Sequence, residues 1–376
     1  MLGKQGMIRY VFTSSNTDGG YCSFMPKLLE GLQKIFILKG PSGTGKSSFL
    51  RLLGQSMAEK GYEVEMWLSA LDPVNPEGLY LPQLEIAVVN GSLPQAIDPG
   101  YPAGRAEIIN LGDYQDRKAV ALRSRDIMEL VQKVEKHHSK AYNILKSIIQ
   151  TREELRQLTA RHLDHGRINQ LCGEIEARLA EEQARERHYF ASAVTADGII
   201  NYIEELSAAC RKRYVFKGPE GCGKSTMIAK LALKAAEKGH FLEYYHCGLE
   251  PESLVMVIIS SSQTALIDAG ELEISLKPWD IIVDLGKCLK DCDPSLLGMK
   301  NSQAYRNHEA MLLQVQEELE NAYLTVKKIK KIYSAAMDYE ALDKKRIEIE
   351  EELSSDFPHA AGGKARKKLP VKCSGE

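Results

Sequence analysis

The chain alternates between apolar runs and amphipathic stretches, and it does so twice in the same order. In the first half, four apolar runs bounded by turn-forming residues predict buried strands: 34–38, 64–68, 84–89 and 107–111. A helical pattern from about residue 46 to 59 separates the first two runs and ends at Lys60-Gly61. Unbroken apolar strands that alternate with helices predict an α/β fold, with a mostly parallel sheet covered by helices on both faces.

Beyond Asp113 the apolar positions change to a spacing of three and four residues. They form one stripe: Ile127, Val131, Val134, His138, Ala141, Leu145 and Ile148. After a break at 163–166 the same spacing returns, which predicts a long helix and a returning helix. We therefore expect a helical hairpin over about 115–186 that projects from the α/β core. A matching stripe predicts a second hairpin over about 302–353.

Both halves carry the same motif in the same place. Gly40-Pro41-Ser42-Gly43-Thr44-Gly45-Lys46-Ser47 and Gly218-Pro219-Glu220-Gly221-Cys222-Gly223-Lys224-Ser225 fit the phosphate-binding pattern G-x-x-x-x-G-K-[ST] at every fixed position. Each follows an apolar run and opens an amphipathic stretch, which is the strand–loop–helix context that the motif needs. Two matches in matching contexts are not plausibly chance.

Other positions keep the register of a tandem duplication. Lys46 and Lys224 are 178 residues apart, and so are Asp72 and Glu250. Asp98 and Asp268 are 170 apart, which we interpret as a loss of eight residues from the second copy before this point. We predict a first domain over 1–186, a second over 187–355, and a disordered basic tail over 356–376.

Composition limits the classes of function. The formal net charge of −2 predicts no general attraction to nucleic acid or to an anionic membrane. No stretch approaches the roughly 18 apolar residues of a membrane span, and the N-terminus has no apolar signal-peptide core. A cytoplasmic protein is the expectation. Eight cysteines in 376 residues do not suggest a disulfide framework.

The two motifs predict nucleotide binding with a divalent cation. Glycines let successive backbone N–H groups converge on phosphate oxygens at the start of a helix. We expect ATP or another nucleoside triphosphate with Mg²⁺, and Lys46 and Lys224 as bridges between its β- and γ-phosphates. We expect the hydroxyl groups of Ser47 and Ser225 to bind Mg²⁺, and those of Ser48 and Thr226 to contact the α-phosphate.

Hydrolysis requires an acid that the sequence does not place clearly. The expected position is the end of the third strand, where we read Asn90 in the first copy and Ser260 in the second. Asp72 and Glu250 follow the next strand after each loop helix, where a carboxylate can orient water or a substrate hydroxyl, and capping of a loop before proline is the alternative. Five basic residues are candidates to contact a γ-phosphate: Arg117, Arg123, Arg125, Lys287 and Lys290. The simpler interpretation is that they lie on a solvated helix face.

Several segments, each present in duplicate, carry a resemblance: Phe12 to Thr17, Gly40 to Ser47, Leu71-Asp72-Pro73, Val88 to Pro94, and Ile108 to Gly112. Over nearly its whole length the chain resembles an uncharacterised family of tandem P-loop proteins of Gram-positive spore-forming bacteria. The resemblance implies two P-loop NTPase domains that bind ATP. That family tends to have Asp-Gly-Thr after the third strand, where we align Asn90-Gly91-Ser92 and Ser260-Ser261-Ser262. This departure argues against catalysis, more strongly in the second copy.

Three functions remain open. The first is an ATP-binding tandem P-loop NTPase, a slow ATPase that acts as a switch or motor and whose hairpins contact an unknown protein partner. Its duplicated sites would form an intramolecular pseudo-dimer in which one copy completes the site of the other. The second is a small-molecule or nucleotide kinase with a helical lid. The third is a non-catalytic ATP-dependent assembly protein.

Overall fold

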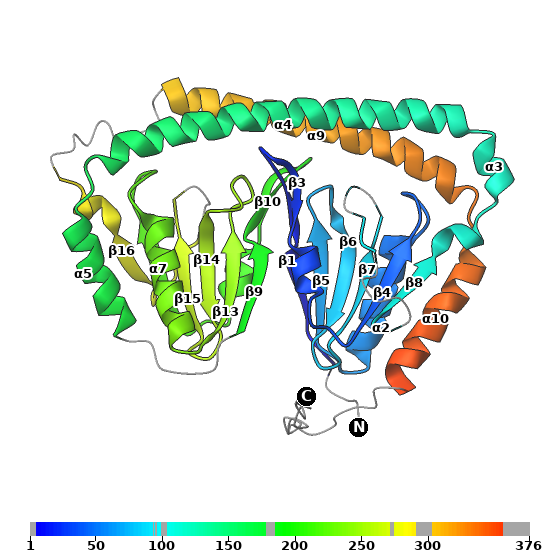
Figure 1. Ribbon diagram of the computed structural model, residues 1–376, viewed down its shortest axis with the longest axis horizontal. Coiled ribbons are helices and arrows are strands. Elements are labelled where there is room, and N and C mark those ends of the chain that lie inside the picture. The colour runs from blue at the N-terminus through cyan, green and yellow to red at the C-terminus, as the bar shows by residue number, and fades with distance from the viewer. Residues whose placement is uncertain are drawn as a thin grey trace, which may run out of the picture.

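A single sheet runs through both halves of the chain. The computed structural model describes residues 5–92, 94, 96–98, 104–177, 185–270, 274–290 and 303–355. In these residues twelve strands follow the order β16-β12-β15-β14-β13-β9-β1-β5-β6-β7-β4-β8 (Figure 1). The α/β fold expected from the sequence is confirmed. The predicted tail over 356–376 lies outside the described residues.

The strand order of one half repeats that of the other outward from the centre. The first half contributes β1 (Ile8–Phe12), β4 (Lys34–Lys39), β5 (Val64–Ser69), β6 (Asp72–Leu81), β7 (Ile86–Asn90) and β8 (Ala106–Asn110). The second half contributes β9 (Arg185–Phe190), β12 (Lys212–Lys217), β13 (Phe241–His246), β14 (Leu254–Ile259), β15 (Thr264–Asp268) and β16 (Ile281–Asp284). Strands β1 and β9 meet antiparallel at Phe12 and Phe190, which joins the two halves.

Six of the eleven neighbouring pairs are parallel, and four of the five antiparallel pairs involve β6 or its counterpart β14. Strand β6 and its counterpart β14 each run against both neighbours. Strand β6 begins in the proline-bearing segment at Asp72, which the sequence pattern places in a loop. Its pairing with β5 is irregular where Pro76 falls, because proline cannot donate to a ladder.

Shorter elements surround the ends of the strands. Two small hairpins repeat the duplication, β2–β3 (Ser14–Thr17, Gly20–Ser23) and β10–β11 (Ser192–Thr195, Gly198–Asn201). Each is followed by a short helix, α1 (Met25–Leu28) or α6 (Ile203–Ser207). After the last strand of each half come the 3₁₀ turns η1 (Leu111–Tyr114) and η2 (Leu285–Cys288), and η1 leads into α3 (Arg117–Ala121).

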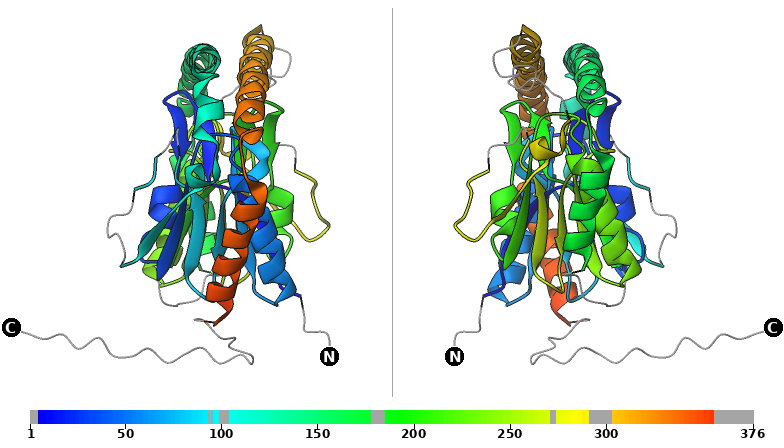
Figure 2. Two further views of the ribbon diagram at one scale, coloured as in Figure 1. Left: turned by 90° about the vertical axis from the view of Figure 1, so that its right-hand side faces the viewer. Right: turned by 90° about the vertical axis from the view of Figure 1, so that its left-hand side faces the viewer.

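Two long helices lie side by side and antiparallel across one end of the sheet, α4 (Ser124–Ala160) and α9 (Gln303–Ser334) (Figures 1 and 2). The apolar stripe of α4 at Ala141, Leu145 and Ile148 belongs to the same core as Val315 and Leu319 of α9. A 37-residue helix is about 55 Å long, so α4 can reach from one half to the other.

The helical arms are therefore exchanged between the halves. Helix α5 (His165–Glu176) packs against α7 (Lys224–Glu237) of the second half, and α10 (Tyr339–Ser355) packs against α2 (Lys46–Glu59) of the first. Figure 2 shows α10 beside α2. The expectation of a hairpin folded on itself over 115–186 and over 302–353 is wrong, because α4 finds its apolar partner on α9 rather than on α5.

No helix among the described residues is both long enough and apolar enough to cross a membrane.

Candidate functional site

The two glycine loops share one backbone conformation. The first glycine loop (Gly40–Ser47) joins β4 to α2, and the second (Gly218–Ser225) joins β12 to α7. Gly45 and Gly223 have φ values of 91° and 89° immediately before their helices. A side chain is strained in this left-handed region, so glycine is required there. The motif residues predicted from the sequence are thus brought together in both halves.

Each loop lysine is buried and folded back over its own loop. Lys46 Nζ donates hydrogen bonds to the carbonyl oxygens of Gly40 and Pro41, the latter at 2.8 Å. Lys224 Nζ donates to the carbonyl oxygens of Gly218 at 3.0 Å and Pro219 at 2.9 Å. Burial, together with the positive charge of Lys330, lowers the pKa of Lys46 to about 8. Among the described residues no ion pair within 4 Å joins Lys46 to a carboxylate, and a buried ammonium of this kind is suited to receive an anion.

The strand beside each loop strand ends in a polar residue, and here the sequence alignment was wrong. Asn90 of β7 pairs with Leu38 of β4, and Asp268 of β15 pairs with Phe216 of β12, each 178 residues further on. The counterpart of Asn90 is therefore Asp268 and not Ser260. The run that ends at Ile259 is β14, the counterpart of β6.

The second half consequently has an acid, Asp268, at the position where the sequence alignment put Ser260. Asp268 Oδ1 lies 3.9 Å from Lys224 Nζ and accepts a hydrogen bond of 2.8 Å from the backbone N–H of Gly270. Burial raises the pKa of Asp268 to about 6, although Lys224 opposes the shift. Asp98, which we had aligned with it, is instead 79% exposed and paired with Lys39 at 2.7 Å.

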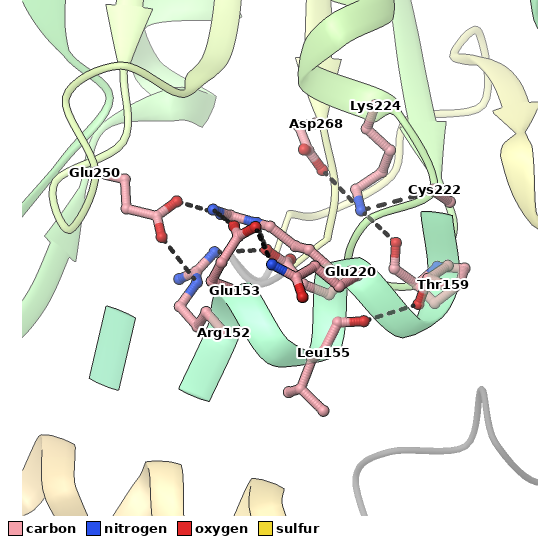
Figure 3. Close-up of polar contacts among 12 residues, drawn as sticks. Arg152, Glu153, Leu155, Thr159, Glu220, Cys222, Lys224, Glu250 and Asp268 are labelled. Atoms are coloured by element: carbon pink, nitrogen blue, oxygen red, sulfur yellow. Dashed lines mark hydrogen bonds and ion pairs between the residues drawn. The ribbon is translucent and has the colours of Figure 1, made fainter. Parts of the chain in front are cut away.

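The opposite half supplies cations to the second loop (Figure 3). Arg152 and Arg156 come from α4, and both contact Glu220, a residue of the loop itself, at 3.2 and 2.7 Å. Both also contact Glu250, Arg152 at 3.6 Å and Arg156 through a hydrogen bond. Arg152 and Glu250 are only 5% and 8% exposed. The predicted residue Glu250 therefore lies at its loop, engaged by two arginines.

The first loop receives Lys330 of α9 in the same way. Lys330 Nζ pairs with the predicted residue Asp72. A side chain at Gly43 would collide with the Lys330 backbone, as one at Gly221 would collide with the backbone of Arg156. Arg156 and Lys330 are 174 residues apart, which is also the spacing between the matching segments Glu174-Ile175-Glu176 and Glu348-Ile349-Glu350. They are thus equivalent residues.

Among the described residues, none of the five basic residues nominated from the sequence forms a hydrogen bond or ion pair with a glycine loop. Arg117, Arg123 and Arg125 pair with acids on or next to their own helices, and Lys290 pairs with Asp164. Sequence reasoning missed Arg152, Arg156 and Lys330. The available signal was a basic residue on the inner side of each long helix at the 174-residue spacing.

A cavity of about 1440 Å³ adjoins the first loop. It is lined by that loop, by the start of β6, by the β2–β3 hairpin and by both long helices. Ser47 and Ser48 lie at its wall, in the first turn of α2, and Ser225 and Thr226 occupy the same turn of α7.

The donor set fits a hard cation such as Mg²⁺ only together with phosphate oxygens, because each loop offers one hydroxyl directly after its lysine, that of Ser47 or of Ser225. No group of three or more His, Cys, Asp or Glu able to hold a metal occurs in the described part of the chain. No protein-family model, curated protein or solved structure matches the chain.

Proposed function

We propose that the protein binds nucleoside triphosphates, ATP foremost, at both glycine loops and acts as a slow ATPase switch. The observation that carries the proposal is the doubled geometry: a buried lysine folded over a left-handed glycine loop at a helix N-terminus, with a cation from the other half beside it. Backbone N–H groups and the helix dipole at such a position favour phosphate.

The residues then have distinct tasks. On binding, phosphate oxygens replace the loop carbonyls as acceptors for Lys46 and Lys224. Ser47 and Ser225 would hold Mg²⁺, which would offset the negative charge of the phosphate groups. Arg156 and Lys330 contact the terminal phosphate from the opposite half, in the manner of a residue supplied in trans.

The two sites differ in their acid. Asp268 lies beside Lys224 and is placed to orient water or a metal ligand, whereas the first half has the amide of Asn90 at this position. We assign hydrolysis to the second loop and stable nucleotide binding to the first. Because α4 and α9 each contact one loop and extend over the other half, nucleotide at either loop would bias the position of the paired helices.

Phosphate release from Mg-ATP tests the assignment. Asp268→Asn should lower the rate about 10²-fold or more, the usual contribution of a positioned acid or base. The matched control is Asp98→Asn, since this carboxylate is 79% exposed and pairs with Lys39 of the first half rather than with a residue of the second loop, so the rate should be unchanged. A rate that is equal in wild type and in Asp268→Asn contradicts hydrolysis at the second loop.

A kinase is the second candidate, and the cavity beside the first loop favours it. Its volume exceeds the roughly 300–1,000 Å³ of a usual ligand pocket, which leaves room for an acceptor next to a nucleotide. A kinase would release little phosphate until an acceptor is added, whereas the proposed switch releases it alone.

A further inference from the structure

A half-buried carboxylate lies at the wall of the cavity that adjoins the first loop. Glu77 of β6 accepts hydrogen bonds from Thr13 Oγ1 at 2.9 Å, Ser14 Oγ at 3.1 Å and Tyr21 OH at 3.0 Å. Its side chain lines the cavity together with Tyr21 and Ser69. We call these five residues, Thr13, Ser14, Tyr21, Ser69 and Glu77, the Glu77 cluster.

The cluster supplies hydroxyl donors but no cation. Among the described residues, none of the ion pairs within 4 Å involves Glu77. Burial raises the pKa of Glu77, and the surrounding hydroxyl groups oppose that shift by donating to the charged form. An ionised carboxylate enclosed without a counter-ion is costly, so the site is incomplete in electrostatic terms.

The duplication provides an internal control for the role of the cluster. At the 178-residue spacing, which the strand pairings confirm, four of the five positions lose their hydroxyl or carboxyl group. Thr13, Tyr21, Ser69 and Glu77 correspond to Ala191, Ile199, Cys247 and Val255. The same strands and hairpin therefore form without an acid at this position, and the fold does not require the Glu77 cluster.

The remaining walls suit the body of an organic cation. Tyr142 of α4 and Tyr323 of α9 line the same cavity and offer apolar ring surface to such a body. The ring of Tyr323 also faces the ammonium groups of Lys327 and Lys330, at 4.5 and 5.9 Å from its centroid. The basic residues Lys46 and Lys330 lie at the glycine-loop end. The cavity wall thus carries basic side chains suited to phosphate and, at Glu77, a carboxylate that forms no ion pair with them among the described residues.

We propose that the Glu77 cluster binds a small organic cation, a protonated amine with an apolar or aromatic body, in the same cavity as the first glycine loop. The ammonium group would donate to Glu77 and complete its electrostatic environment, and the tyrosines would contact the body. This site goes beyond nucleotide binding, because none of its five residues belongs to a glycine loop.

Calorimetric titration with two probes of matched shape tests the proposal. Tyramine carries the ammonium group, and 4-ethylphenol has the same ring and chain length without it. Wild type should bind tyramine at least about tenfold more tightly, which is the effect of a charge-assisted hydrogen bond. Glu77→Gln keeps an oxygen acceptor for the hydroxyl groups but removes the charge, so it should abolish the preference. The control Glu129→Gln, on the exposed side of α4 where Glu129 pairs with Arg125, should retain it.

Three outcomes overturn the proposal. They are equal affinities of wild type for the two probes, a preference that survives in Glu77→Gln, and absence of tyramine binding combined with weaker ATP binding in Glu77→Gln. The comparison of probes on wild type decides the matter even if Glu77→Gln does not fold. Lys46→Ala should lose ATP at the first loop and keep its tyramine affinity. A chain that binds tyramine through Glu77 but never binds ATP contradicts the proposed function alone.

Discussion

Arg152 holds one buried carboxylate, Glu250, and one half-buried carboxylate, Glu220, at the second loop, and its removal should destabilise the whole chain. Arg152→Met preserves the length and apolar volume of the side chain but leaves Glu220 and Glu250 with Arg156 as their remaining arginine. Breaking a buried ion pair from one side costs about 3–5 kcal/mol. Since Arg156 still contacts both acids, we expect the lower value, a loss of about 3 kcal/mol in the free energy of unfolding.

Equilibrium unfolding in guanidinium and thermal unfolding measure this loss. For 376 residues the unfolding entropy is about 0.8 kcal/mol/K, so about 3 kcal/mol lowers Tm by about 4 °C. Adding Glu250→Gln should restore part of the stability, because one of the stranded charges is then removed.

Arg125→Met is the control on the same helix. Arg125 is 92% exposed and paired with Glu129 at 3.2 Å, and such surface pairs contribute at most about 1 kcal/mol. If Arg152→Met changes stability no more than Arg125→Met, the account of the second loop as a buried charge network is refuted.

Three further predictions follow from the loops. Because the pKa of Asp268 is raised to about 6, the folded state binds more protons than the unfolded state between about pH 4 and 6. The free energy of unfolding should therefore fall by up to about 3 kcal/mol as pH rises through this window. Asp268→Asn should abolish that fall in denaturation curves. Because the pKa of Lys46 is lowered to about 8, ATP binding at the first loop should weaken as pH rises above 8 in calorimetric titrations. Lys330→Met should move this weakening to higher pH, because the charge of Lys330 helps to lower the pKa of Lys46. Gly43→Ala places a methyl group against the Lys330 backbone at a positive φ, and it should lower the free energy of unfolding in chemical denaturation by at least about 2 kcal/mol. Gly173→Ala, in open space within α5, should be neutral or stabilising. Equal effects of the two substitutions would refute the close contact.

The local sequence pattern was sufficient to predict the strands and helices that bury a continuous apolar face. The strands that end at Lys39 and Lys217, the helices that begin at Lys46 and Lys224, and both left-handed glycines follow from short-range rules. The glycine loops could be predicted because a fixed spacing of glycine and lysine is itself the geometric requirement.

Long-range choices were beyond such rules. The stripe on α4 specifies an apolar partner but not which helix supplies it, and α9 and α5 are both adequate by pattern. Strand β6 was missed because its prolines resemble a loop. That omission shifted the alignment of the second half by one strand, so that Ser260 took the place of Asp268. Arg152 and Arg156 were overlooked because a cation on an inner helix face acquires its role only when the opposite half is in place.

Nucleotide-binding stoichiometry tests the central claim most directly. Titration of wild type with a non-hydrolysable ATP analogue and Mg²⁺ should give two nucleotides per chain. Lys46→Ala and Lys224→Ala should each reduce this to one, because each removes the buried ammonium of a different loop. If both variants bind as many nucleotides as wild type and with the same affinity, the glycine loops do not hold phosphate and the account is wrong.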